Sequence, residues 1–443
     1  MGLGLLKNIF SSPKKEEESA ALDKIKVVVV AFDDNCLTNS GQILSEYLEA
    51  NSLLDVCYYD EPMDKKFLNL ESRNFFDFID NGKRILRKTK SDVLIWGYRS
   101  QEKIRLNFQI LNQYENQTVP VFSILNELYL PLFYFQDRKI LPSILDLIFA
   151  TILTIINNDK YSSALGQTVN KINNSAPPHD LDVSYMPYIL NLLALTYLNS
   201  VKDNVTKKDV KIVSQILKNA VSYPQKDVKS VLSGLVYANF GQLYQLASEF
   251  SADGKYENIK LAIDCYTHSQ KYFNRQIFPY DFGGIAYRLS KLYFSCWKHA
   301  ADIQLLRDAI FHLREAQKVF TQMLFPKMWA EIQKDLGLYL SMMGVFARSD
   351  EVSMIAVENF KNYQKIYNKN NSPYEYAKAQ ENIGNIFFEC GKIYGNEEYF
   401  EEACKYYLDA ADIYEDIKKF SEYDKMQICV IKADEHILRL SKD

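Results

Sequence analysis

The sequence predicts an α+β domain with a mixed sheet and helices, followed by an all-α superhelical solenoid of stacked helical hairpins. Two observations support this fold class. Short β-branched runs alternate with helical segments only before about residue 140, and such alternation is typical of α/β domains. Beyond that point, residues of one type recur at a step of 47 positions, which indicates copies of one supersecondary unit. We expect four regions: a flexible leader at 1–23, a small α/β domain at 24–140, connecting helices and degenerate helical repeats at 141–230, and the repeat array at 231–443.

The first domain is predicted from its alternating segments. The run KVVVVAF at 26–32 is β-branched and continuous, as in a strand buried on both faces. Asn and Ser are residue types that cap helices, and a polar turn between two apolar runs indicates a hairpin. In chain order, the expected elements are a strand at 26–32, a helix capped by Asn39 or Ser40 and running through Leu48, a strand at 54–60, a helix containing 75–86, a hairpin at 91–111 and a further strand at 119–124.

The end of the first strand is the best candidate for chemistry. Asp33 and Asp34 follow it directly, ligands gather beyond the carboxyl ends of strands, and paired carboxylates can hold Mg²⁺. The alternative function is therefore a nucleotide- or ligand-sensing regulator or an enzyme with its site here. However, no phosphate-cradling glycine loop follows, and the five histidines lack partners at metal spacing. We favour a solvated loop and expect no catalytic residue, cofactor or metal.

The composition indicates which partners and which cellular compartment to expect. A net charge of −4 gives no electrostatic case for nucleic acid. The seven cysteines are scattered and never spaced as C-x-x-C, which suits a reducing cytoplasm better than a disulfide framework or a zinc site. The longest apolar run, at 144–156, contains Asp146 and is too short to span a membrane. We expect a buried helix there, no integral membrane segment and a cytoplasmic protein, and leave peripheral membrane contact by residues 1–10 open.

Within the array, each unit is predicted to be a pair of helices. A proline suits the first turn of the leading helix, a small residue suits the point where the following helix crosses closely, and Asp, Ser or Asn can cap the second helix. The slots that keep the 47-residue step hold Pro279, Pro326 and Pro373; Ser290, Gly337 and Gly384; Asp302, Ser349 and Asn396; and Ala262, Ala309, Ala356 and Ala403.

One motif in these units resembles a known repeat family. The matching residues are Pro326, Trp329, Ala330, Gln333, Leu336 and Gly337, and in the next unit Pro373, Tyr376, Ala377, Gln380, Ile383 and Gly384. The pattern P-x-x-W-A-x-x-Q-x-x-L-G is similar to that of the extended tetratricopeptide arrays of some bacterial proteins, although the usual tetratricopeptide unit is about 34 residues. The segments SDVLIWGY and IRLNFQI resemble the amino-terminal domain of TolB-like proteins. The resemblance implies a protein–protein interaction scaffold.

A binding surface follows from the repeat register. In such arrays the leading helices line the concave side, so residues near the small slot that lie outside the apolar pattern are expected to face a groove. These candidates are Gln242, Gln245, Tyr287, Lys291, Phe294, Lys334, Ser341, Glu381, Asn385 and Glu389. We expect a non-enzymatic adaptor that holds a peptide or helix of another protein. Self-association through stacking of arrays is the second alternative.

Overall fold

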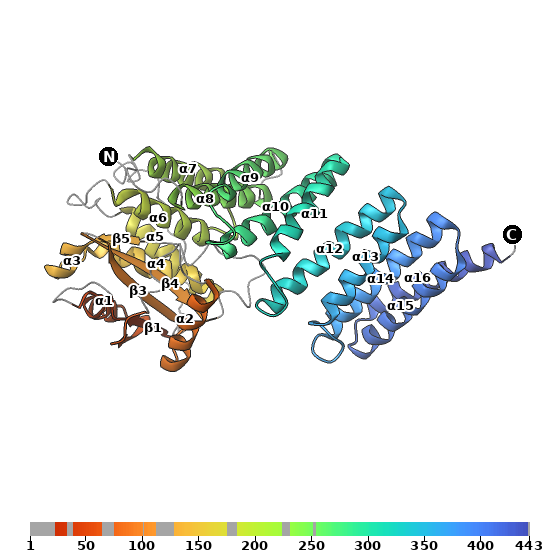
Figure 1. Cartoon of the computed structure of the whole chain (residues 1–443), viewed down its shortest axis with the longest axis horizontal. Helices are drawn as coiled ribbons and strands as arrows, with labels where there is room; N and C mark the ends of the chain where they lie inside the picture. The colour runs from red at the N-terminus through yellow and green to blue at the C-terminus, as the bar shows by residue number, and fades with distance from the viewer. Residues whose placement is uncertain are drawn as a thin grey trace. The chain divides into compact units, whose positions relative to one another are not determined.

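The computed structural model describes residues 23–32, 39–63, 75–100, 102–111, 128–174, 184–223, 231–250 and 254–441. These residues form two compact units, the first ending at Ile285 and the second beginning at Ala286. The predicted fold class is confirmed, because a mixed sheet with helices comes first and a helical repeat region follows (Figure 1). The boundaries of the four predicted regions stay a prediction.

Within the described residues, a five-stranded sheet forms the centre of the first unit. Its strands are β1 (Ile25–Val30), β2 (Leu54–Tyr59), β3 (Val93–Ser100), β4 (Lys103–Ile110) and β5 (Leu128–Pro131). Their order is β2-β1-β3-β4-β5. β1 is parallel to both β2 and β3, whereas β3 and β4 form the predicted hairpin and β4 pairs with β5 in antiparallel register.

Two crossover helices, α1 (Ser40–Glu49) and α2 (Phe75–Thr89), connect the parallel strands. The chain runs from β1 outward to β2 and then back past β1 to β3. Right-handed crossovers in opposite directions place their helices on opposite faces of a sheet. Accordingly, Val27 of β1 belongs to the core that α1 covers, whereas the Gln109 amide of β4 donates to the Ile79 carbonyl of α2 at 3.0 Å.

The sequence located the start of α1 but missed the last strand. Asn39 caps α1, since its side chain accepts a hydrogen bond from the Gln42 amide at 3.2 Å. β5 is only four residues long and ends in Pro131, a residue tolerated where no ladder hydrogen bond is donated. The strand expected at 119–124 lies outside the described residues.

Connecting helices follow the sheet in the first unit. They are α3 (Leu132–Gln136), α4 (Pro142–Ile156), a 3₁₀ turn at Asp159–Tyr161, α5 (Ser162–Asn174), α6 (Met186–Ser200) and α7 (Lys207–Ser222). The predicted buried helix is confirmed in α4, where every residue from Leu147 to Ile155 is buried. In the part of the chain that the structure describes, no helix combines the length and apolar character needed to cross a membrane.

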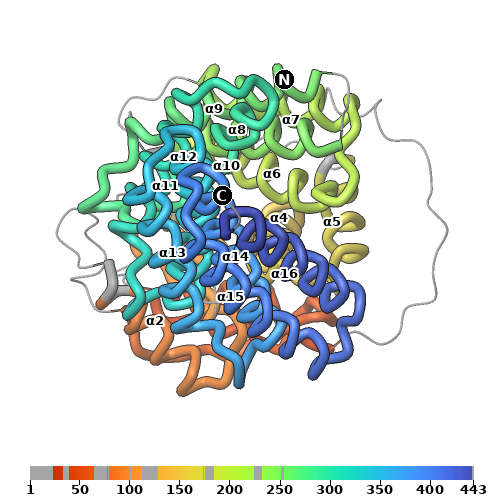
Figure 2. The backbone as a smooth tube through the Cα atoms, turned by 90° about the vertical axis from the view of Figure 1, so that its right-hand side faces the viewer, coloured from red at the N-terminus to blue at the C-terminus, as the bar shows by residue number. Residues whose placement is uncertain are grey.

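The rest of the described chain is helical; within the first unit α8 packs on α9, and within the second unit the helices from α11 to α16 pack on their neighbours in chain order (Figure 1 and Figure 2). The helices are α8 (Val231–Phe250), α9 (Lys255–Gln270), α10 (Pro279–Ala300), α11 (Ile303–Gln317), α12 (Pro326–Ala347), α13 (Asp350–Gln364), α14 (Pro373–Tyr394), α15 (Glu397–Asp416) and α16 (Phe420–Leu440). The leading helices α10, α12 and α14 are each 22 residues long, and each begins at a proline.

Local signals set the ends of these helices. Asp302, Ser349 and Asn396 cap the trailing helices by accepting backbone N–H groups two or three residues further on, at N–O distances of 2.9, 3.3 and 2.9 Å. Pro326 and Pro373 occupy the first turn of their helices, where a missing N–H costs nothing. The predicted caps and helix starts are confirmed.

Glycine permits the close crossing of α12 with α13 and of α14 with α15, as predicted. A Cβ atom at Gly337 of α12 would lie 2.8 Å from the ring of Phe360 of α13. A Cβ at Gly384 of α14 would lie 2.7 Å from the ring of Tyr407 of α15. Since both rings are buried, a side chain at either glycine would force the two helices apart.

Candidate partner-binding groove

A cavity of about 430 Å³ opens among the helices of the second unit. Helix α12 provides five of its twelve lining residues, α14 provides four, and α10 and α13 complete it. The lining residues are Trp297, Leu338, Ser341, Met342, Val345, Phe346, Ser353, Phe360, Asn382, Asn385, Ile386 and Glu389. We call this cavity the groove. Its size lies within the range of about 300–1,000 Å³ that is usual for ligand pockets.

One side of the groove is apolar and open to solvent. Leu338, Met342 and Val345 follow one another at helical spacing along α12. Phe346 beside them is 63% exposed and Val345 is 41% exposed. A large apolar side chain that stays exposed next to a cavity is a feature of interaction surfaces. This side of the groove therefore offers apolar area that a partner could bury.

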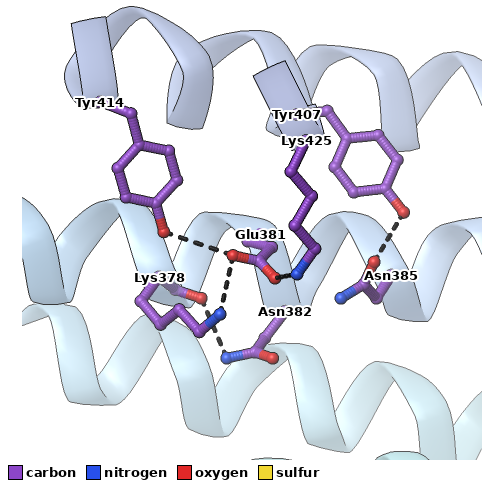
Figure 3. Close-up of polar contacts among 7 residues, drawn as sticks. All are labelled: Lys378, Glu381, Asn382, Asn385, Tyr407, Tyr414 and Lys425. Carbon is purple, nitrogen blue, oxygen red and sulfur yellow. Dashed lines mark hydrogen bonds and ion pairs between the residues drawn. The ribbon is translucent and has the colours of Figure 1, made fainter. Parts of the chain in front are cut away.

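The opposite side carries two amide side chains from α14. Asn385 accepts a hydrogen bond through Oδ1 from the Tyr407 hydroxyl at 2.9 Å, and the Asn382 amide nitrogen donates to the Lys378 carbonyl at 2.9 Å (Figure 3). Among the described residues, neither the Asn385 nitrogen nor the Asn382 oxygen has a hydrogen-bond partner. The groove thus combines an apolar wall with one donor and one acceptor.

A buried carboxylate lies next to these amides on α14. Glu381 is 3% exposed; its oxygens contact the ammonium groups of Lys378 at 2.9 Å and Lys425 at 2.6 Å, and the Tyr414 hydroxyl at 3.3 Å (Figure 3). Burial by itself would raise the pKa of Glu381, but the hydrogen bonds from both lysines outweigh burial and lower that pKa. Because Lys425 belongs to α16, the cluster ties two leading helices together.

A second buried carboxylate ties α10 to α12. Asp335 accepts the Tyr287 hydroxyl at 3.0 Å and contacts the Lys291 ammonium at 2.6 Å. Burial, and then the charge of Asp335, raise the pKa of Tyr287. Lys334 contacts Glu331 within the same helix, and that contact raises the Lys334 pKa against the opposing effect of burial. Three predicted groove residues, Tyr287, Lys291 and Lys334, are therefore engaged in intramolecular contacts.

Four other predicted site residues belong to the second unit; three line the groove and one is buried. Ser341, Asn385 and Glu389 line the groove together, and Glu389 also contacts Lys392 at 2.9 Å. Phe294 is buried and stacks on Tyr339 of α12, with ring centroids 4.0 Å apart.

Two candidates lie in the first unit, on α8. Gln245 accepts the Tyr266 hydroxyl at 3.2 Å. The buried Oε1 of Gln242 has no hydrogen-bond partner among the described residues. Binding of a partner by any of the ten candidates stays a prediction.

Sequence reasoning missed the apolar wall. Met342, Val345 and Phe346 lie outside the motif positions that repeat every 47 residues. Asn382 occupies the slot that Asp335 occupies in the preceding unit, so the residue type at this slot is not kept. The available signal was the helical spacing of Leu338, Met342 and Val345, on a different face from the residues that pack inside the hairpin. The predicted groove residues were those near the small slot that lie outside the apolar pattern, so this apolar row was not among them.

The structure does not describe the two aspartates that were the best candidates for catalysis or metal binding. Asp33 and Asp34 lie outside the described residues. Within the described residues, no group of three or more His, Cys, Asp and Glu side chains is placed to hold a metal ion. His312 stacks on Tyr293 with centroids 5.3 Å apart, and burial lowers its pKa. This histidine thus has a packing role inside the second unit.

Comparisons with known proteins give only distant similarity. No family model matches the sequence, and no curated protein matches it. Similar solved structures include BtubC (BKLC) from P. vanneervenii, at 12% identity and a TM-score of 0.39, over 63% of this chain and 93% of that chain. A Rap protein complexed with competence and sporulation factor has 15% identity and a TM-score of 0.35, over 67% of this chain and 77% of that chain. TM-scores of this size carry no argument about function.

Proposed function

We propose that the protein is a non-enzymatic adaptor that holds a helix or peptide of another protein in the groove of its second unit. The observation that supports this most is the exposed apolar wall of Val345 and Phe346 beside a cavity of about 430 Å³. Amphipathic helices bind such grooves by inserting apolar side chains at helical spacing. Asn382 and Asn385 lie where they can hydrogen-bond polar groups of the bound segment.

The charges around the groove favour a partner recognised by shape and apolar contact. Glu381, Asp335 and Glu389 each contact a lysine of this chain, so most of the local charge is already compensated. Compensated charges attract neither strongly acidic nor strongly basic segments. The bound segment is accordingly amphipathic with a near-neutral apolar face.

The array is, in our proposal, an extended tetratricopeptide array with units of 47 residues, and the first domain is TolB-like. The spacing of the leading helices, which begin at Pro279, Pro326 and Pro373, supports the first of these proposals. We further propose a cytoplasmic protein that needs no cofactor and does not bind nucleic acid. The net charge of −4 supports this setting, as do the described free cysteines Cys57, Cys265, Cys296, Cys390, Cys404 and Cys429.

The test is site-specific photo-crosslinking in the native host. A photoreactive phenylalanine analogue at position 346 should capture a partner protein, and the same analogue at Phe311 should not. Phe311 on α11 is a matched control, because it is 58% exposed and does not line the groove. The partner identified at position 346 then provides a direct binding assay.

In that assay, Phe346→Asp should weaken binding by at least tenfold, since an anchor residue of an interface contributes about 2 kcal/mol or more. Phe311→Asp should leave the dissociation constant unchanged. Equal effects of the two substitutions, or equal capture at both positions, would exclude the groove as the binding site.

A further inference from the structure

One position of the leading helices carries an aromatic ring in α10 and α14 but not in α12. The three helices have the same length of 22 residues and start 47 positions apart, so residues 47 apart occupy the same place in each. Phe294, Ser341 and Phe388 are such a set. The ring that the other two leading helices carry is therefore missing from α12.

Between α10 and α12, this place is filled by two stacked rings. The Phe294 ring lies on the Tyr339 ring of α12, with centroids 4.0 Å apart and planes inclined by 18°. The two side chains are 8% and 1% exposed. A stacked aromatic pair stabilises more than its buried area alone would give. The chain thus closes the junction of α10 and α12 with rings of its own.

Between α12 and α14, the two corresponding places hold no ring. The residues 47 positions after Phe294 and Tyr339 are Ser341 and Ile386, and both line the groove. The groove therefore opens where the repeat has replaced a phenylalanine by a serine. An engineered apolar cavity of about 150 Å³ holds benzene, and the groove measures about 430 Å³. It has room for an aromatic ring.

The remaining lining residues suit a ring as well. Trp297, Phe346 and Phe360 all line the groove, and rings that meet edge to face or in offset stacks attract one another. Glu389 is the one charged residue among the lining residues, and it contacts Lys392 at 2.9 Å. The walls thus offer aromatic contacts and little uncompensated charge.

We propose that the groove binds an aromatic side chain of the partner protein. Its ring lies between α12 and α14 in the place that Phe294 takes between α10 and α12. This inference rests on the adaptor function proposed above, and it adds the class of residue that anchors the partner: phenylalanine, tyrosine or tryptophan. The anchor completes a junction that the chain leaves open.

Binding of p-cresol to the full chain tests the site without a partner. This probe has the ring and hydroxyl group of a tyrosine side chain, and ligand-observed NMR measures its dissociation constant. The saturated analogue 4-methylcyclohexanol has nearly the same size but no aromatic ring. We expect p-cresol to bind about two- to tenfold more tightly, because ring–ring contacts add to area burial by this factor.

Ser341→Phe gives α12 the ring that α10 and α14 carry, so it should weaken p-cresol binding at least tenfold. Ser341→Ala keeps the space and should bind p-cresol as wild type does. Ser421→Phe is the matched control, because position 421 is exposed on α16 and does not line the groove. If circular dichroism shows that Ser341→Phe does not fold, Ile386→Tyr fills the same space from α14.

The partner captured at position 346 provides the second readout. It should bind Ser341→Phe at least tenfold more weakly than wild type and Ser341→Ala normally. The ring site would be refuted if p-cresol did not bind wild type, if it bound Ser341→Phe equally well, or if the saturated analogue bound more tightly.

The partner also separates this inference from the adaptor function. A partner that loses affinity for Phe346→Asp but binds Ser341→Phe as it binds wild type would refute the aromatic anchor alone. A partner indifferent to Phe346→Asp would refute the adaptor function itself, whatever p-cresol does.

Discussion

Replacing Gly337 with alanine adds a single carbon atom where α12 and α13 cross. That carbon would lie 2.8 Å from two ring atoms of Phe360, a side chain that is 1% exposed. Ordinary carbon–carbon contacts are about 3.5–4.0 Å, so the ring or the helices must move by roughly 0.7 Å or more. Overfilling a packed core costs about 1–3 kcal/mol, and removing a glycine from a helix interior gains about 1 kcal/mol.

We therefore expect Gly337→Ala to lower the free energy of unfolding of the second unit by about 1 kcal/mol. The loss should be larger for Gly337→Leu, which adds three further carbons. Urea unfolding followed by tryptophan fluorescence measures this change. In a Trp96→Phe background the signal comes only from Trp297 and Trp329, which both belong to the second unit.

A double-mutant cycle with Phe360→Leu isolates the crossing contact. Leucine lacks the ring that the new methyl group meets, so the double variant should be more stable than the two separate losses predict. Gly166 of α5 is the comparison site, since a Cβ there would have no atom within 4 Å. Gly166→Ala should stabilise the first unit by about 0.5–1 kcal/mol, followed by the fluorescence of Trp96 in a Trp297→Phe, Trp329→Phe background, because Gly166 and Trp96 both belong to that unit. If Gly337→Ala stabilised the chain to the same extent, close crossing would not be the reason for the glycine.

Two further substitutions test local features of the second unit. Ser349→Ala removes the acceptor of the Val352 amide and should cost about 1 kcal/mol, measured as a lower urea midpoint; an unchanged midpoint would mean that the cap does not hold the start of α13. Glu381→Gln removes a carboxylate whose pKa is held below its ordinary value of 4.5. The stabilisation from that carboxylate is present above pH 4.5 and is lost as the pH falls through the lowered pKa. The variant should therefore be less stable than wild type at neutral pH, and this difference should shrink in acid; a constant difference from neutral to strongly acidic buffers would contradict the ion-pair account.

Local sequence signals predicted the parts of the fold that depend on few residues. The β3–β4 hairpin was predicted because a polar turn separates two apolar runs. The caps at Asp302 and Ser349 were predicted because capping needs one side chain and the next few backbone amides. β5 was missed because a four-residue strand ending in Pro131 gives little periodicity, and its pairing depends on β4, about twenty positions earlier.

The candidate site was only partly predictable. The repeat register predicted that Ser341, Asn385 and Glu389 face a groove, and all three line the cavity of the second unit. The repeat register did not reveal that Lys291 contacts Asp335 or that Lys425 contacts Glu381. These pairs join different helices, and which side chains meet there depends on the distance and rotation between the helix axes.

By itself, the sequence determined a mixed-sheet domain, a helical array and the glycine positions where its hairpins close. These features follow from the periodicity of residue types and from glycine, proline and capping residues, whose effects extend over only one or two helical turns. Only the tertiary structure decided which charges are compensated and that Phe346 stands exposed beside a cavity. Exposure and charge pairing depend on what every neighbouring helix covers, and no single segment of sequence contains that information.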